Sequence, residues 1–287
     1  MKYAYYPGCS AESTAREQYM SVCEVARALG IELVEPKGWT CCGSTPAHHT
    51  SKFLSIALPA TNLLMAKKMG LDMVVFCAAC YNRMKVANHE IKTNPGIRKE
   101  VADALCEDYD GSVRVLHFTE VLIKETGIKK LKKYFTHSLN GLKVASYYGC
   151  LLVRPQEVTG FDDPENPTLI DQLVTAMGGE SIDWPHKVEC CGGGFAISRT
   201  DIVIGLSNSV LGMAKSAGAQ CIAVACPMCQ INLDMRQENI NRIYNAGYDM
   251  PIVYISQLLG LCLGIPSHKL GMNKCIVSPQ TAIEYVK

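Results

Sequence analysis

The stretch Cys190-Cys191-Gly192-Gly193-Gly194 has a shorter counterpart in the same chain, Cys41-Cys42-Gly43. Each Cys-Cys-Gly motif has one cysteine upstream and a Cys-x-x-Cys motif downstream, separated from the cysteine pair by 34 residues in both cases. Ten of the 15 cysteines therefore form two matched sets. The first set is Cys9, Cys41, Cys42, Cys77 and Cys80, and the second is Cys150, Cys190, Cys191, Cys226 and Cys229. We interpret the two sets as metal-cluster sites and the rest of the chain as their scaffold.

The bulk composition is that of a folded protein with a large core. Of the 287 residues, 48% are hydrophobic and 19% are charged, which excludes extensive disorder. The net charge of +1 argues against nucleic acid or a membrane as a partner. No run of 18 apolar residues is present, and residues 1–9 lack the apolar stretch of a signal peptide. We expect a cytoplasmic protein, in which abundant cysteines indicate metal or redox chemistry rather than disulfides.

Strands alternate with helices along the chain, which is typical of parallel sheets with right-handed crossovers. The predicted strands are 2–6, 31–34, 72–76, 113–118, 143–148, 181–184, 220–225 and 251–255. The predicted helices are 13–29, 51–69, 81–91, 119–124, 167–177, 202–216, 228–244 and 257–261. The expected fold class is α/β, with two tandem, pseudo-symmetric Rossmann-like halves.

An internal repeat relates the two halves. Residues 2–9, Lys-x-Ala-x-Tyr-x-Gly-Cys, resemble residues 143–150, and both the Cys-Cys-Gly and the Cys-x-x-Cys motifs recur after 149 residues. The repeat predicts two cluster-binding domains, 1–140 and 141–287.

The predicted topology brings each cysteine set to one edge of a sheet. The lone cysteine follows the first strand of its half, the cysteine pair follows the second, and Cys-x-x-Cys follows the third. Ligands bind outside the carboxyl ends of parallel strands, where helix N-termini also favour thiolates. A structural zinc or a cubane iron–sulfur cluster takes four cysteines, whereas each set has five. Either one cysteine per set is spare, or the cluster is opened out.

The doubled motif resembles the CCG-domain family, in particular the CCG-containing catalytic chains of methanogen heterodisulfide reductases. The resemblance covers essentially the whole chain and implies that each five-cysteine set binds a non-cubane [4Fe-4S] cluster. It also implies an enzyme of methanogenesis, an oxidoreductase that reduces the CoM-S-S-CoB heterodisulfide to coenzyme M and coenzyme B thiols.

Electrons would have to come from a partner, because the sequence has neither a ferredoxin-type cysteine run nor a Gly-x-Gly-x-x-Gly loop. The resemblance implies a small ferredoxin-like subunit, a flavin-containing subunit, and a hydrogenase or formate dehydrogenase module. Two alternatives stay open. One is an electron-transfer subunit of a hydroxy-acid or quinone-linked oxidoreductase, and the other is a zinc-stabilised interaction module.

Several further residues are candidates by their proximity to the motifs. His48 and His49 are possible proton donors to a departing thiolate, although solvated loop histidines are commoner. Cationic groups are expected around a substrate that carries sulfonate, phosphate and carboxylate groups. The candidates are Arg16, Arg83, Arg154, Lys187 and Arg199. The unmatched cysteines, expected in the core or on the surface, are Cys23, Cys106, Cys221, Cys262 and Cys275.

Overall fold

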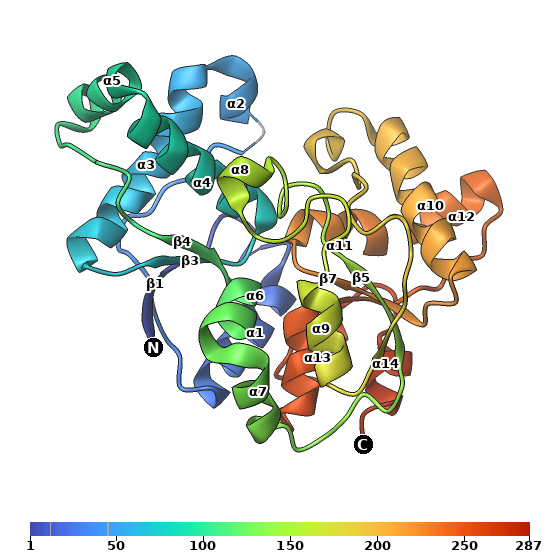
Figure 1. Ribbon diagram of the computed structural model, residues 1–287. Coiled ribbons are helices and arrows are strands. Elements are labelled where there is room, and N and C mark those ends of the chain that lie inside the picture. The colour runs from blue at the N-terminus through green and yellow to red at the C-terminus, as the bar shows by residue number, and fades with distance from the viewer. Residues whose placement is uncertain (12, 45) are drawn as a thin grey trace.

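The computed structural model describes residues 1–11, 13–44 and 46–287, and the chain forms two halves with one sheet each (Figure 1). The strands of the first sheet are β1 (Lys2–Tyr6), β2 (Glu32–Val34), β3 (Met73–Val75) and β4 (Val115–His117). Those of the second sheet are β5 (Lys143–Tyr147), β6 (Glu180–Ser181), β7 (Cys221–Val224) and β8 (Ile252–Tyr254). The strand orders are β2-β1-β3-β4 and β6-β5-β7-β8, with parallel pairing throughout. The predicted fold class, two tandem Rossmann-like α/β halves, is confirmed.

Helices connect the strands and cover the sheets (Figure 1). The helices of the first half are α1 (Arg16–Ala28), α2 (Pro46–Thr50), α3 (Lys52–Met69), α4 (Ala78–Thr93), α5 (Pro95–Leu105), α6 (Phe118–Glu120), the π-helical η1 (Val121–Gly127), α7 (Ile128–Leu131) and η2 (Lys132–Tyr134). Those of the second half are α8 (Gln156–Thr159), α9 (Leu169–Ala176), η3 (Gly193–Phe195), α10 (Thr200–Ser216), α11 (Pro227–Asp234), α12 (Gln237–Tyr244), α13 (Ile255–Cys262), η4 (Met272–Lys274) and α14 (Gln280–Glu284).

The core of each half lies on its two inner strands. All residues of β3 and β7 are buried, and both segments are continuous apolar runs. Such a run is what a parallel strand needs when helices cover both faces of its sheet. These strands lead directly to the two Cys-x-x-Cys motifs, so the core fixes the start of each motif.

Several helices differ from the expected pattern, and the short helices α2, α7, α8 and α14 were not predicted. Helix α5 was not predicted from the sequence, although Asn94 caps it by accepting hydrogen bonds from the N–H groups of Gly96 and Ile97, with Pro95 at the first helical position. The helix expected over 228–244 is two helices, α11 and α12. The side-chain amide of Gln237 donates to the carbonyl of Leu233 at 2.9 Å, and that carbonyl is the one a continuous helix would pair with the Gln237 N–H.

The halves pack through helices and through hydrogen bonds to loop carbonyls. Helix α1 packs against α13, where the hydroxyls of Ser21 and Ser256 are 2.7 Å apart (Figure 1). Helix α4 packs against α8, and the Tyr81 hydroxyl donates to the carbonyl of Thr159 at 2.9 Å. Because α4 begins at a Cys-x-x-Cys motif, this interface also positions cysteines of the first half beside the second half.

Candidate metal centre

The first cysteine set gathers at the carboxyl edge of its sheet. Cys77 is the N-cap of α4, and Cys80 lies in the first turn of that helix. The Cys42 and Cys80 sulfurs are 3.2 Å apart, and interactions with the thiols of Cys41 and then Cys80 lower the pKa of Cys42 to about 3. Cys9 follows β1 and is exposed at this edge. The helix N-terminus further favours thiolates here, because its free N–H groups carry partial positive charge.

The second set lines one cavity of about 60 Å³. All five cysteines of the set line this cavity: Cys150, Cys190, Cys191, Cys226 and Cys229. The Cys191 and Cys229 sulfurs are 3.6 Å apart, close to the separation of the equivalent pair in the first half. A hydrogen bond with Cys150 lowers the pKa of Cys190 to about 6, so this thiol is readily ionised.

Backbone groups approach the sulfurs in the same way in both halves. The Gly43 N–H donates to the Cys41 sulfur at 3.4 Å, and the Gly192 N–H donates to the Cys190 sulfur at 3.3 Å. Gly149 has φ +65°, and a Cβ atom there would lie 3.1 Å from the Cys229 sulfur. A glycine at this position therefore provides both the left-handed backbone and the close approach to the thiol.

Two tyrosines hold the cysteine-pair loops, a feature that the sequence analysis missed. The Tyr6 hydroxyl donates to the carbonyl of Thr40 at 2.8 Å, and the Tyr147 hydroxyl donates to the carbonyl of Glu189 at 2.5 Å. Each acceptor immediately precedes a Cys-Cys pair. The repeated Lys-x-Ala-x-Tyr-x-Gly-Cys segments carried the signal, because they place one tyrosine at the same position of the first strand in each half.

The two sets meet across the junction of the halves. The Cys77 thiol interacts with that of Cys226, and this interaction raises the pKa of Cys77 well above its ordinary value. Ala78, the residue after Cys77, lines the cavity of the second set. Clusters held by the two sets would therefore be neighbours.

The histidine candidates lie beside a larger cleft. His48 and His49 are exposed residues of α2, with ring centroids 4.6 Å apart. His49 lines a cleft of about 540 Å³ together with Met228 and the segment 193–198. This cleft shares Gly193, Gly194 and Met228 with the cavity of the second set.

Of the cationic candidates, Arg83 is the one whose charge acts on a cysteine pair. The Arg83 side chain is half-buried, and this burial lowers the pKa of its guanidinium group. The negative charge of the Cys42 thiolate partly offsets the effect, because it raises the same pKa. Arg16 is exposed at the start of α1. Among the described residues, the linings of the cavity and the cleft include none of the five cationic candidates.

The other three cationic candidates are engaged with carboxylates. Arg154 pairs with Glu165 at 2.9 Å, Arg199 pairs with Asp201 at 2.7 Å, and Lys187 pairs with Asp171 at 3.0 Å. The Lys187 ion pair is buried, whereas the other two are exposed. The ion pair with Asp171 therefore holds the Lys187 ammonium inside the fold.

The unmatched cysteines are separate from both sets. Cys221 and Cys262 are fully buried, and burial raises the pKa of each thiol to about 12. Cys275 also has a pKa raised to about 12 by burial, Cys23 is half-buried and Cys106 is exposed. The buried members of this group behave as small apolar residues.

The donor chemistry of the two sets fits iron–sulfur clusters. Each set offers soft sulfur donors in direct contact, with backbone N–H groups directed at them. Among the described residues, no three His, Cys, Asp or Glu side chains converge in the arrangement that holds a single metal ion.

Comparison with known proteins identifies the class. The chain matches the family described as Cysteine-rich domain (CCG) over residues 3–85 and 144–234, and it belongs to this family. The family and its heterodisulfide reductase members support a redox role based on iron–sulfur clusters.

Two relatives match most of the chain. The 8-methylmenaquinol:fumarate reductase membrane anchor subunit of Wolinella succinogenes is 30% identical, over 96% of this chain and 97% of its own length. The B subunit of a ferredoxin/F(420)H(2)-dependent CoB-CoM heterodisulfide reductase of Methanosarcina acetivorans is 33% identical, over 86% of this chain and 84% of its own length.

A solved structure supports the fold. A hypothetical protein from Helicobacter pylori superposes with a TM-score of 0.77 at 11% identity, covering 96% of this chain and 52% of that one. Within the part of the chain that the structure describes, none of the helices combines the length and the apolar character needed to cross a membrane.

Proposed function

We propose that this chain is the catalytic subunit of a heterodisulfide reductase. Each five-cysteine set holds one non-cubane [4Fe-4S] cluster, and the substrate is the CoM-S-S-CoB heterodisulfide of methanogenesis. The reaction consumes two electrons and two protons, breaks the S–S bond and forms two S–H bonds. The observation that carries the proposal is the closeness of the two Cys-x-x-Cys loops. The imidazole of His117 lies 3.2 Å from the carbonyl oxygen of Phe76 and 3.1 Å from that of Ala225, the residues that precede Cys77 and Cys226.

The chain's own residues would bind the clusters and handle protons. The ten motif cysteines are the ligands, and the clusters, when bound, supply electrons one at a time. The N–H groups of Gly43 and Gly192 offset negative charge on the sulfurs. His49 is the proposed proton donor, because it lines the cleft that adjoins the second cavity, and His48 lies beside it.

The proposed setting is a cytoplasmic complex. Both relatives described above are named as subunits, which supports partner chains that deliver electrons. We propose a ferredoxin-like subunit, a flavin-containing subunit, and a hydrogenase or formate dehydrogenase module. The domain division at residue 140 and the substrate-binding roles of the cationic candidates stay predictions. Those candidates are Arg16, Arg83, Arg154, Lys187 and Arg199.

Electron paramagnetic resonance on the anaerobically prepared, oxidised protein tests this function. Coenzyme M is added under varied redox poise, and we expect a new cluster signal that is absent without the thiol. A thiol of the same charge that is too bulky for the cavity is the control, and it should give no signal. A protein with full iron and no coenzyme M-dependent signal at any potential would contradict the reductase proposal.

The cleft favours a second candidate, a quinone-linked electron-transfer subunit. Its lining combines Phe195, Ile197 and Met228 with His49, and no lysine or arginine lies among the described lining residues. Such a surface suits a flat apolar molecule better than an anionic disulfide. The relative from Wolinella succinogenes, whose name contains 8-methylmenaquinol, supports the same candidate. Oxidation of the reduced clusters by a short-chain menaquinone, but not by CoM-S-S-CoB, would establish this function instead.

A further inference from the structure

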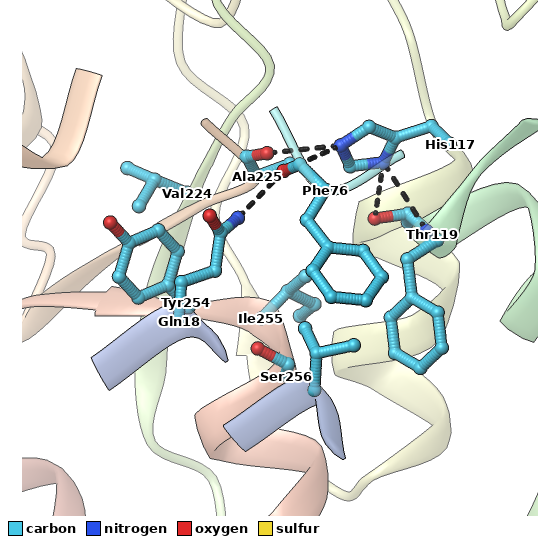
Figure 2. A pocket seen from close by; sticks show the side chains of 11 residues that line it. Gln18, Phe76, His117, Thr119, Val224, Ala225, Tyr254, Ile255 and Ser256 are labelled. Carbon is cyan, nitrogen blue, oxygen red and sulfur yellow. Dashed lines mark hydrogen bonds between the residues drawn. The ribbon is translucent and has the colours of Figure 1, made fainter. Parts of the chain in front are cut away.

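His117 links the two halves directly behind the cysteine sets. It is the last residue of β4 and is 2% exposed. Its Nε2 atom lies 3.2 Å from the carbonyl oxygen of Phe76 and 3.1 Å from that of Ala225, as Figure 2 shows. Phe76 belongs to the first half and Ala225 to the second, so one imidazole spans the junction.

The surrounding contacts define which nitrogen carries the hydrogen. The Thr119 N–H donates to Nδ1 at 3.3 Å, and both neighbours of Nε2 are carbonyl oxygens, which only accept. The Nε2–H group therefore serves both carbonyls as a shared donor. Burial lowers the pKa of His117, which keeps the ring neutral in this tautomer.

The backbone of His117 is fixed as well. Its N–H donates to the Glu120 carboxylate at 3.0 Å, which completes a capping box at the start of α6. Lys124 pairs with the same carboxylate at 3.2 Å and donates to the carbonyl of Phe161 in the second half at 2.6 Å. The backbone of His117 is thus linked, through Glu120 and Lys124, to a second connection between the halves.

The two carbonyl groups that accept from His117 each stand directly before a Cys-x-x-Cys motif. Phe76 precedes Cys77 and Ala225 precedes Cys226, and these cysteines belong to different sets. Gln18 offers a natural comparison, because its side-chain amide donates at 2.7 Å to the carbonyl of Phe76 (Figure 2). Gln18 lies on α1 of the first half and donates to the first Cys-x-x-Cys loop, whereas His117 reaches both loops.

We propose that His117 is a positioning residue that sets the separation of the two Cys-x-x-Cys loops and hence the coupling between the two clusters. This inference rests on the proposed pair of clusters. Electron exchange and spin coupling between neighbouring centres depend steeply on their separation. A donor shared by both loops fixes that separation, which packing of each half alone would leave adjustable.

The test compares His117→Leu with Gln18→Met and reads the clusters themselves. Leucine removes the shared donor at similar volume, whereas Gln18→Met removes a donor to the same Phe76 carbonyl within one half. Samples are matched for iron per chain and poised so that both clusters are paramagnetic. We expect the resolved inter-cluster splitting of the electron paramagnetic resonance spectrum to become a broad distribution in His117→Leu and to persist in Gln18→Met.

A conservative variant separates positioning from simple folding. Glutamine brings an amide NH2 donor close to the place of the His117 Nε2–H group, but on a flexible side chain, so we expect a partly restored splitting in His117→Gln. If His117→Leu fails to retain iron, His117→Met, which also lacks an N–H donor, takes its place, and an unchanged splitting in that variant overturns the proposal. An equal change in Gln18→Met would also overturn it. Absence of two cluster signals in the unmodified protein would instead overturn the proposed function.

Discussion

The thiols of Cys77 and Cys226 lie close enough to interact although they belong to different halves of the chain. Each lies directly after the central buried strand of its half, at the N-terminus of α4 or α11. Helix N-termini from both halves therefore converge at this contact, which favours negative charge there. The closeness of Cys77 and Cys226 would bring two clusters, one held by each set, near enough to exchange electrons.

Removing one thiol of this pair should affect one cluster. We expect Cys77→Ala to retain about four of about eight iron atoms per chain, since the second set stays complete. Cys221→Ala is the matched control, because Cys221 is a buried thiol outside both sets, and it should keep all the iron. Iron and sulfide assays measure the outcome. Full iron in Cys77→Ala would show that Cys77 is no ligand.

The tyrosine that holds the second cysteine-pair loop should matter for stability and for iron. Tyr147→Phe leaves the carbonyl of Glu189 without its 2.5 Å partner, which costs about 1–3 kcal/mol in the free energy of unfolding. We expect partial loss of the second cluster as well. Urea unfolding with iron analysis measures both. Tyr134→Phe, at an exposed position, should change neither, and equal effects of the two variants would contradict this role.

The repeat places Arg83 and Asn232 at equivalent positions, three residues after the end of each Cys-x-x-Cys motif. Arg83 adds positive charge beside Cys42, whereas the Asn232 amide donates to the carbonyl of Cys191 at 3.1 Å. Positive charge stabilises a reduced cluster, so we expect Arg83→Gln to lower the reduction potential of the first cluster alone.

A redox titration followed by electron paramagnetic resonance measures this shift. Arg27→Gln is the control, because Arg27 is an exposed residue of α1 paired with Glu24. An equal shift of both clusters in Arg83→Gln, or no shift, would refute the electrostatic difference between the sites.

Ile197 distinguishes the two candidate substrates. Its side chain is 97% exposed at the cleft, so Ile197→Lys should alter stability by less than about 0.5 kcal/mol. We expect affinity for a quinone to fall by about tenfold, because an apolar contact is lost. Affinity for the anionic heterodisulfide should rise. Ile276→Lys, exposed but outside the described cleft lining, should affect neither ligand, and equal changes in both variants would show that the cleft binds no substrate.

The repeat in the sequence predicted the architecture well for a physical reason. Inner strands that are buried on both faces need continuous apolar runs, and 73–75 and 221–224 are such runs. The cysteines then follow the strands, so their common edge could be predicted before any side chain was placed.

Contacts across the halves could not be predicted in this way. His117 is 41 residues from Phe76 and 108 residues from Ala225, and no periodicity relates them. The packing of the halves decides such pairs. Lys187 illustrates the same limit, because its buried ion pair with Asp171 could not be predicted from its position near a cysteine pair.

Metal analysis of the anaerobically purified chain tests the central claim most directly. Two open iron–sulfur clusters predict about eight iron and about eight sulfide per chain, with negligible zinc. One or two zinc ions per chain with little iron or sulfide would contradict the account and support a zinc-stabilised interaction module instead.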